Sequence, residues 1–134
     1  MSLPIPEYLP FESSRPKALL VEQDPSLRTV LAEALRLYGV WSVAEAWSGE
    51  GVRTCLVDDQ PAVIVWALWG DESELPDELQ AVLEQYPQHG VPCVILVTGG
   101  RDQLAIDNAG VVGRIDSSSG LEGLGLGLVE ILRL

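Results

Sequence analysis

The chain has 134 residues, of which 47% are hydrophobic, and this length and composition suit one globular domain rather than a disordered chain. Eight basic residues face twenty acidic ones, for a net charge of −12, and we therefore expect neither nucleic acid nor an anionic membrane as a partner, because both attract basic surfaces. No apolar run approaches the ~20 residues of a membrane helix. The segment Met1–Glu12 holds three prolines and no basic residue, which favours a cytoplasmic protein over a secreted one.

The first sixteen residues are rich in proline and contain two apolar anchors, Tyr8 and Phe11. Such a segment is typical of an extended arm that packs on its own domain or on a neighbouring molecule. We therefore divide the chain into an N-terminal arm, residues 1–16, and one domain, residues 17–134.

Apolar runs and helical periodicity alternate along residues 17–134 and predict five strands and five helices. The predicted strands are Lys17–Val21, Val40–Ala46, Pro61–Trp69, Val91–Thr98 and Val111–Ile115. The predicted helices are Pro25–Tyr38, Ser48–Val57, Leu75–Tyr86, Arg101–Ala109 and a last helix that runs from a cap at Ser118 or Ser119 to Leu134.

Capping residues support the boundaries of these helices. Asp24 is a favoured N-cap and Pro25 a favoured first helical residue, and Gly39 suits a left-handed C-cap. The third helix is predicted to end at Pro87 and Gly90.

The strict alternation of strands and helices with short loops predicts parallel strands joined by right-handed crossovers. The expected fold class is α/β, a three-layer, doubly wound sandwich with a five-stranded parallel sheet. Ligands of such sheets bind at the carboxyl ends of the strands, so the residues that follow Val21, Trp66, Val97 and Ile115 are the candidate site.

At and near these strand ends, five fragments resemble the response-regulator receiver family, the CheY-like domains of two-component signalling. The fragments are Leu20–Arg28, Ala46–Gly51, Pro61–Leu68, Val91-Pro92 and Ala109–Gly113. The resemblance covers residues 17–134 and implies the CheY-like, flavodoxin-like form of the doubly wound fold.

The resemblance also implies a chemistry. In the family, an aspartate at the end of the third strand accepts a phosphoryl group from a histidine kinase, and an acidic pair after the first strand holds Mg²⁺. A Thr or Ser after the fourth strand and a Lys after the fifth contact the phosphoryl group. The metal and the lysine neutralise the negative charge of the transferring group.

This chain departs from that pattern at most positions. Ala67 stands at the phosphoacceptor position, and a methyl group cannot accept phosphoryl. Glu22 and Gln23 stand at the acidic pair, so one negative charge is lost, and the neighbouring Asp24 is better used as a helix cap. Among the other family positions only the hydroxyl position keeps its residue type, as Thr98. The substituted positions are Arg114 at the aromatic switch, Ser117 at the lysine and Ser118 at the proline that follows it.

The sequence therefore predicts a pseudo-receiver of two-component phosphorelay signalling. We expect it to act by protein–protein contact, without enzymatic activity and with doubtful Mg²⁺ binding. Two alternatives remain open: an active receiver with a displaced phosphoacceptor such as Asp71, and a flavodoxin-like module that binds a small molecule. Trp66 and Trp69 are expected to fill the core and the pocket rather than to form a ligand site.

The remaining reactive side chains predict no further site. Cys55 and Cys93 are far apart in sequence, and a structural disulfide is not expected. His89 is the single histidine, and with no second histidine and no CxxC pair it does not support a zinc site; a solvated loop position is expected for it.

The last helix suggests self-association. If Leu121, Leu124, Leu128, Ile131 and Leu132 face the sheet, three apolar residues remain on the outer side: Leu126, Val129 and Leu134. An apolar outer face of this kind often marks an interface, and receiver domains commonly pair through this region, here residues 101–109, 111–115 and 118–134. The alternative is that the arm of residues 4–11 covers Leu126 and Val129.

Overall fold

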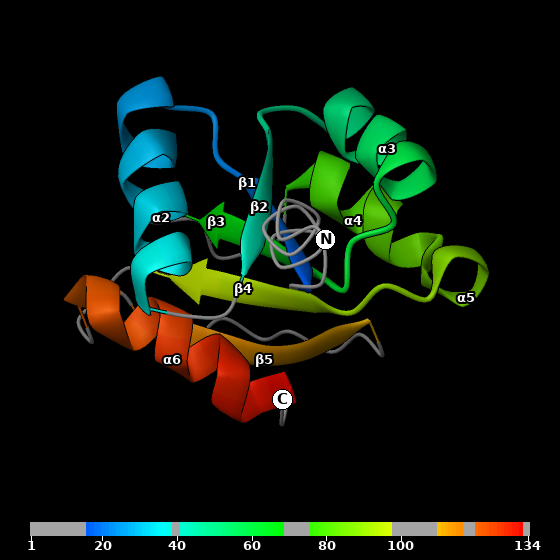
Figure 1. The fold of residues 1–134 in the computed structure, drawn as a ribbon. Helices are drawn as coiled ribbons and strands as arrows, with labels where there is room; N and C mark the ends of the chain where they lie inside the picture. The colour runs from blue at the N-terminus through cyan, green and yellow to red at the C-terminus, as the bar shows by residue number, and fades with distance from the viewer. Residues whose placement is uncertain (1–15, 39–40, 69–75, 98–109, 117–119, 133–134) are drawn as a thin grey trace, which may run out of the picture.

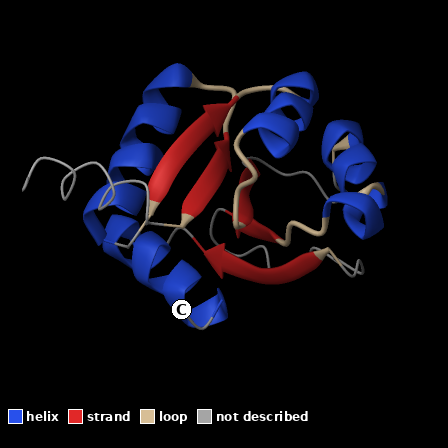
Figure 2. Cartoon of the chain, turned by 45° about the vertical axis from the view of Figure 1, so that its right-hand side comes forward, coloured by secondary structure: helices blue, strands red, loops and turns tan. Residues whose placement is uncertain are grey.

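The computed structural model describes residues 16–38, 41–68, 76–97, 110–116 and 120–132. These residues form one five-stranded sheet with helices on both of its faces (Figures 1 and 2). The three-layer α/β architecture expected from the sequence is confirmed. The predicted arm, the predicted helix at 101–109 and the loop that contains Asp71 lie outside the described residues.

All strand pairings in the sheet are parallel, and the strand order is β2-β1-β3-β4-β5. The strands are β1 (Lys17–Val21), β2 (Ser42–Ala46), β3 (Val63–Leu68), β4 (Cys93–Val97) and β5 (Val111–Asp116). The chain order reverses between β1 and β3, so the carboxyl ends of these two strands flank the switch point at which doubly wound sheets bind ligands.

The helices lie on both faces of the sheet. They are α2 (Pro25–Tyr38), α3 (Gly49–Asp58), α4 (Asp77–Glu84), α5 (Tyr86–His89) and α6 (Gly120–Leu132). Helices α2 and α6 cover one face, and α3 and α4 cover the other (Figure 1). The near-continuous apolar runs of β1, β3 and β4 follow from this arrangement, because both sides of these central strands are buried.

Alternate strand residues feed two separate cores. In β1, Leu20 points into the core under α2 and α6, whereas Leu19 points into the core under α3 and α4. Leu128 from α6 is completely buried in the first core, and Leu79 from α4 is completely buried in the second. The predicted inward orientation of Leu128 is thus confirmed.

The prediction for the third helix is wrong in one respect. Pro87 does not end it: α4 already ends at Glu84, and Pro87 lies in the first turn of the separate one-turn helix α5. Proline fits there because the first turn of a helix does not use its backbone N–H. Gly90 ends α5 with φ 67°, the left-handed conformation that glycine adopts without strain.

Candidate functional site

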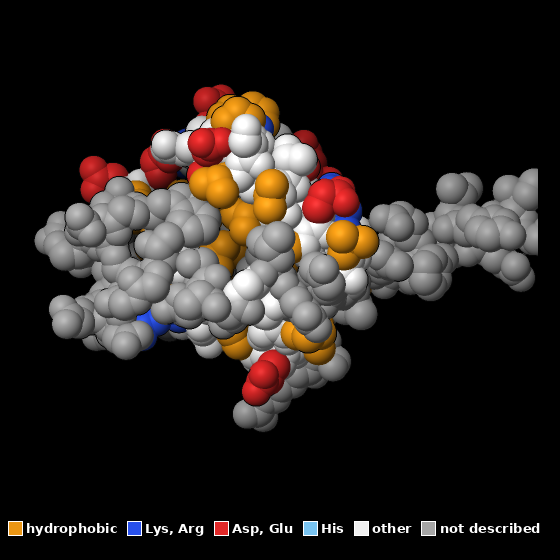
Figure 3. All heavy atoms as spheres, turned by 90° about the vertical axis from the view of Figure 1, so that its left-hand side faces the viewer, with side chains coloured by type: hydrophobic (Ala, Val, Ile, Leu, Met, Phe, Trp, Pro, Cys, Tyr) orange, Lys and Arg blue, Asp and Glu red, His pale blue; other side chains and the backbone are white. Residues whose placement is uncertain are grey.

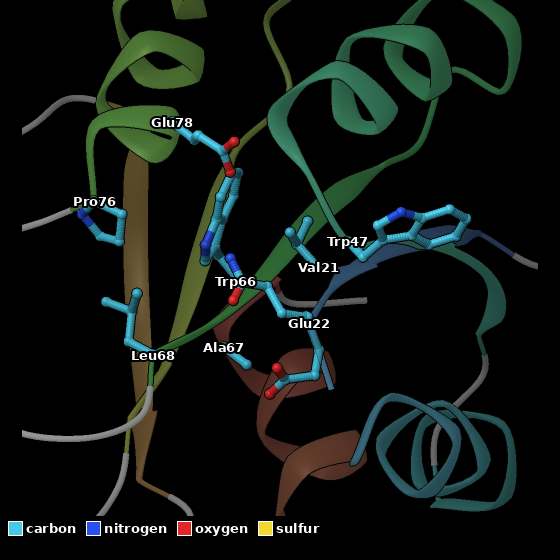
Figure 4. A pocket seen from close by; sticks show the side chains of 9 residues that line it. Val21, Glu22, Trp47, Trp66, Ala67, Leu68, Pro76 and Glu78 are labelled. Carbon is cyan, nitrogen blue, oxygen red and sulfur yellow. The ribbon is translucent and has the colours of Figure 1, made fainter. Parts of the chain in front are cut away.

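A cavity of about 250 Å³ opens at the carboxyl ends of β1 and β3 (Figure 4). It is lined by residues that follow these two strands and by the starts of the neighbouring helices. The lining residues are Val21, Glu22, Gln23, Trp47, Trp66, Ala67, Leu68, Pro76 and Glu78. Two of the four strand ends that the sequence identified, those after Val21 and Trp66, thus lie at one hollow.

The loop after β1 uses its carboxylates to hold its own backbone. Asp24 Oδ1 accepts hydrogen bonds from the backbone N–H groups of Ser26 (2.8 Å) and Leu27 (3.2 Å), which is the predicted N-cap of α2. Glu22 is only 5% exposed, and its Oε2 accepts a hydrogen bond from the backbone N–H of Asp24 at 3.1 Å. Both carboxylates are therefore already engaged with the loop, while Gln23 is exposed at the cavity.

Ala67 is the second-to-last residue of strand β3 and pairs with Leu96 of β4. Its methyl group faces the carboxylate of Glu22 (Figure 4). It is half-buried and packs against the core under α2 and α6. A methyl group at this position offers no oxygen for phosphoryl transfer or for metal binding. The wall of the cavity beside Glu22 is therefore apolar.

Trp66 supplies the other wall. Its side chain is only 5% exposed and belongs to the core under α3 and α4, with the carboxylate of Glu78 beside the indole (Figure 4). The prediction that Trp66 fills the core and the pocket agrees with this burial. Trp69 lies outside the described residues.

Arg28 is a site residue that the sequence reasoning missed. Its Nη1 donates hydrogen bonds to the backbone oxygens of Glu22 (2.9 Å) and Gln23 (3.5 Å), and its Nε lies 3.3 Å from Oε1 of Glu45. The guanidinium carbon also lies 5.0 Å from the ring centroid of Trp47, a cation–π contact. Arg28 thus joins the loop after β1 to strand β2 and to the loop that follows it.

The other predicted positions are spread out or not described. Arg114 is exposed on β5, where it pairs with Ile95 of β4 rather than lining the cavity. Thr98, Ser117 and Asp71 lie outside the described residues. Of the predicted site residues within the described ranges, the cavity brings together Glu22, Gln23 and Ala67.

His89 is not the solvated loop residue that the sequence suggested. Its ring is half-buried, Nε2 lies 3.0 Å from the carbonyl oxygen of Val82, and Nδ1 accepts a hydrogen bond of 2.9 Å from the backbone N–H of Val91. The first contact requires a proton on Nε2 and the second a lone pair on Nδ1, so this geometry selects the neutral Nε2–H tautomer. His89 fixes the turn between α5 and β4.

Both cysteines are free thiols. Burial raises the pKa of Cys93 to about 12, and burial together with the nearby Asp59 raises the pKa of Cys55. Neither thiol therefore has the lowered pKa of a reactive nucleophile. Within the described ranges no three His, Cys, Asp or Glu side chains gather as metal ligands, and no helix there is long and apolar enough to span a membrane.

A scan of the sequence against protein-family models finds no match, and a search of the curated proteins finds none either. Solved structures do match. The receiver domain of NtrX from Brucella abortus superposes with a TM-score of 0.67 at 20% identity, over 87% of this chain and 98% of that chain. The signal receiver domain of an HD domain-containing protein from Pseudomonas fluorescens Pf-5 gives a TM-score of 0.68 at 19% identity, over 89% and 95%.

A third match is the chemotaxis response regulator CheY4 of Vibrio cholerae, with a TM-score of 0.62 at 19% identity over 87% of this chain and 98% of that chain. All three superpositions cover nearly the whole of both chains, and the strand order and the helix layers are those expected from the resemblance in the sequence. The chain therefore has the CheY-like fold of response-regulator receiver domains.

Proposed function

We propose that this chain is a receiver-like module of two-component signalling that works by contact with other proteins and does not accept a phosphoryl group. The observation that carries the proposal is Ala67. It lies near the carboxyl end of β3 and lines the cavity at the switch point of the sheet. The sequence resemblance aligns it with the phosphoacceptor aspartate of the receiver family. A side chain without a nucleophile at that position removes the first step of phosphotransfer.

The charge of the cavity supports the same conclusion. Its described lining carries the carboxylates of Glu22 and Glu78, together with the neutral Gln23 and Ala67, and includes no Lys or Arg side chain. Phosphoryl transfer requires cations that neutralise the charge of the transferring group. With Glu22 engaged by the loop backbone, we expect weak Mg²⁺ binding at best.

The acidic surface favours a protein partner over nucleic acid or membrane, and the module would act in the cytoplasm without a cofactor. Self-association through the last helices remains part of this proposal. No contact among the described residues favours either a displaced phosphoacceptor at Asp71 or a bound small molecule.

The test is incubation with acetyl phosphate and Mg²⁺, read by intact mass, with a phosphorylatable receiver domain treated in parallel. We expect the mass to stay unchanged and millimolar Mg²⁺ to leave the melting temperature unchanged. A stoichiometric gain of one phosphoryl group that Asp71→Asn abolishes would instead establish an active receiver with a displaced acceptor. A clear Mg²⁺ shift that Glu22→Ala abolishes would contradict the metal part of the proposal.

A further inference from the structure

We propose that Trp47, Glu50 and Glu78 form a docking surface for a segment of a partner protein that presents an arginine or lysine side chain. We call these three residues the Trp47 surface. The biological role of this contact rests on the proposed protein-contact function, whereas the surface itself is argued from its own geometry. It lies beside the cavity at the carboxyl ends of β1 and β3, at the loop between β2 and α3.

Trp47 is 61% exposed, although Trp41 and Trp66 are almost completely buried in the same domain. Figure 4 shows its indole directed away from the centre of the cavity. A large aromatic side chain exposed to this degree supplies contact area that folding does not use. Tryptophan is also among the residues that most often dominate the binding energy of protein interfaces.

The indole is held in place. Arg28 contacts its ring from one side, and Arg28 is itself fixed by the carbonyl oxygen of Glu22 and the carboxylate of Glu45. A side chain that is ordered before binding loses less conformational entropy on binding. Because Arg28 contacts only one face of an indole that stays largely exposed, the rest of the ring can receive a second cation.

Arg28 contacts the indole, but the charged residues that line the two hollows beside it, among those that the structure describes, are negative. Trp47 borders two hollows: the cavity of about 250 Å³, and a second hollow of about 390 Å³ over β2 and α3. Glu22 and Glu78 line the first hollow and Glu45 and Glu50 line the second. Neither lining includes a Lys or Arg among the described residues. The surface on both sides of Trp47 therefore complements a positive charge.

Two of these carboxylates have no ion-pair partner among the residues that the structure describes. Glu45 is already paired with Arg28 and lies 3.7 Å from Arg36, whereas the structure records no ion pair for Glu50 or Glu78 among the residues it describes. Both are exposed in the first turns of their helices, where the helix dipole stabilises a carboxylate without neutralising it.

Gly49 lets the side chain of Glu78 approach the start of α3. A Cβ atom at this position would lie 3.4 Å from Cβ of Glu78 and 3.6 Å from its carboxyl carbon. The side chain of Glu78 from α4 therefore lies across the start of α3, directly beside Glu50 and two residues from Trp47. Elements that are separate in sequence thus place Glu78 in one hollow beside Trp47 and Glu50 in the other.

This combination selects the chemistry of the occupant. A guanidinium or ammonium group gains from an aromatic face and from carboxylates at once, whereas an acidic segment or a nucleic acid would be repelled. The occupant is therefore a protein segment that presents a basic side chain beside an apolar one, the latter to cover the exposed indole edge.

The experiment titrates the ¹⁵N-labelled chain with a tryptophan-free capped peptide, Ac-Ala-Arg-Leu-Ala-Arg-Leu-Gly-NH₂, and follows the indole N–H signals. The Trp47 signal is assigned by its loss in Trp47→Phe. We expect this signal to shift saturably, and the same peptide with both arginines replaced by citrulline to leave it in place. The double variant Glu50→Gln/Glu78→Gln should weaken the apparent affinity at least fivefold.

The charge-matched control is Asp58→Asn/Glu84→Gln, which removes two exposed carboxylates at the opposite ends of the same two helices. It should leave the affinity within twofold. No saturable shift, an equal shift with the citrulline peptide, or an equal loss in the control variant would each overturn the inference. None of these outcomes depends on the acetyl phosphate result, so a failure here is distinguishable from a failure of the proposed function.

Discussion

Asp24 stands directly after the loop residues that the receiver family uses for metal binding, and its carboxylate serves the fold instead. Oδ1 accepts the backbone N–H groups of Ser26 and Leu27, two of the donors that have no partner within α2. We expect Asp24→Ala to lower the free energy of unfolding by about 1 kcal/mol, measured by urea denaturation. Gln23→Ala, at the exposed neighbouring position, should have little effect, and an equal loss in both variants would contradict the capping role.

Cys93 predicts a pH dependence of stability. Burial raises the pKa of its thiol from 9.0 to about 12, so the folded chain holds this proton more tightly than the unfolded chain. The contribution is fully present below pH 9 and is lost as the pH rises toward 12, with a limiting slope of about 1.4 kcal/mol per pH unit.

The measurement compares Cys55→Val with Cys55→Val/Cys93→Val by urea denaturation between pH 8 and 11, so that a single thiol distinguishes the two proteins. The stability of the chain that keeps Cys93 should fall faster above pH 9. Parallel curves over the whole range would show that the Cys93 thiol does not contribute.

Side chains such as Arg28 show what the sequence could not predict at this scale. The cap at Asp24 depends on residues two and three positions away, so local spacing was enough to predict it. The contacts of Arg28 with Glu45 and Trp47 join helix α2 to strand β2 and to the loop after it, and they exist only once β1 and β2 pair. No spacing rule encodes a contact of that kind.

At the scale of whole elements, the apolar runs predicted the sheet, because a strand buried on both faces leaves a continuous apolar signal. The break at Gln85 was not predictable in the same way, since Leu79, Val82, Leu83 and Tyr86 continue the helical periodicity across it. The boundary between α4 and α5 is set by backbone hydrogen bonds, from Gln85 N–H to the carbonyl of Val82 and from Gln88 and His89 N–H to the carbonyl of Gln85. The apolar pattern does not record these bonds.

The contact between β5 and α6 depends on the absence of a side chain at Gly113. A Cβ atom there would lie 2.8 Å from Cδ1 of Ile131 and 2.9 Å from Cγ2, distances that force the helix or the side chain to move. We expect Gly113→Ala to lower the free energy of unfolding by about 1–3 kcal/mol, as overpacking commonly does. Urea denaturation measures the loss.

A double-mutant cycle with Ile131→Ala tests whether the clash with Ile131 causes this loss of stability. Because Ile131→Ala removes the clashing atoms, Gly113→Ala should be nearly neutral in the Ile131→Ala background. Gly127→Ala, in the helix that carries Ile131, is the comparison for Gly113→Ala. Its Cβ would meet only Cδ1 of Ile115 at close range, 3.2 Å, and alanine favours the helix. Additive losses at Gly113 and Ile131 would show that the two do not interact.

For the whole molecule, two apolar surfaces compete as self-association sites. Leu126 of α6 is 53% exposed, which agrees with its predicted outward position, whereas Val129 is half-buried and Leu134 lies outside the described residues. Val112 of the neighbouring β5 is 45% exposed. Helix α2 carries the other surface, with Leu27, Val30 and Leu37 exposed, and Figure 3 shows apolar side chains on this side of the molecule. The net charge of −12 opposes any pairing of copies at low ionic strength.

We expect a dimer that forms through β5 and α6 and strengthens with salt, since screening reduces the repulsion between two acidic copies. Light scattering up to high micromolar concentration should show a mass that rises toward twice that of the chain. Leu126→Glu places a charge in the apolar contact and should return the protein to a monomer, whereas Leu37→Glu on α2 adds the same charge and should leave the dimer intact. If the N-terminal arm covers Leu126 instead, the full chain stays monomeric and deletion of residues 1–15 exposes the surface and permits pairing. A chain that remains monomeric at all concentrations and salt levels, both with and without residues 1–15, would show that this apolar face does not mediate self-association.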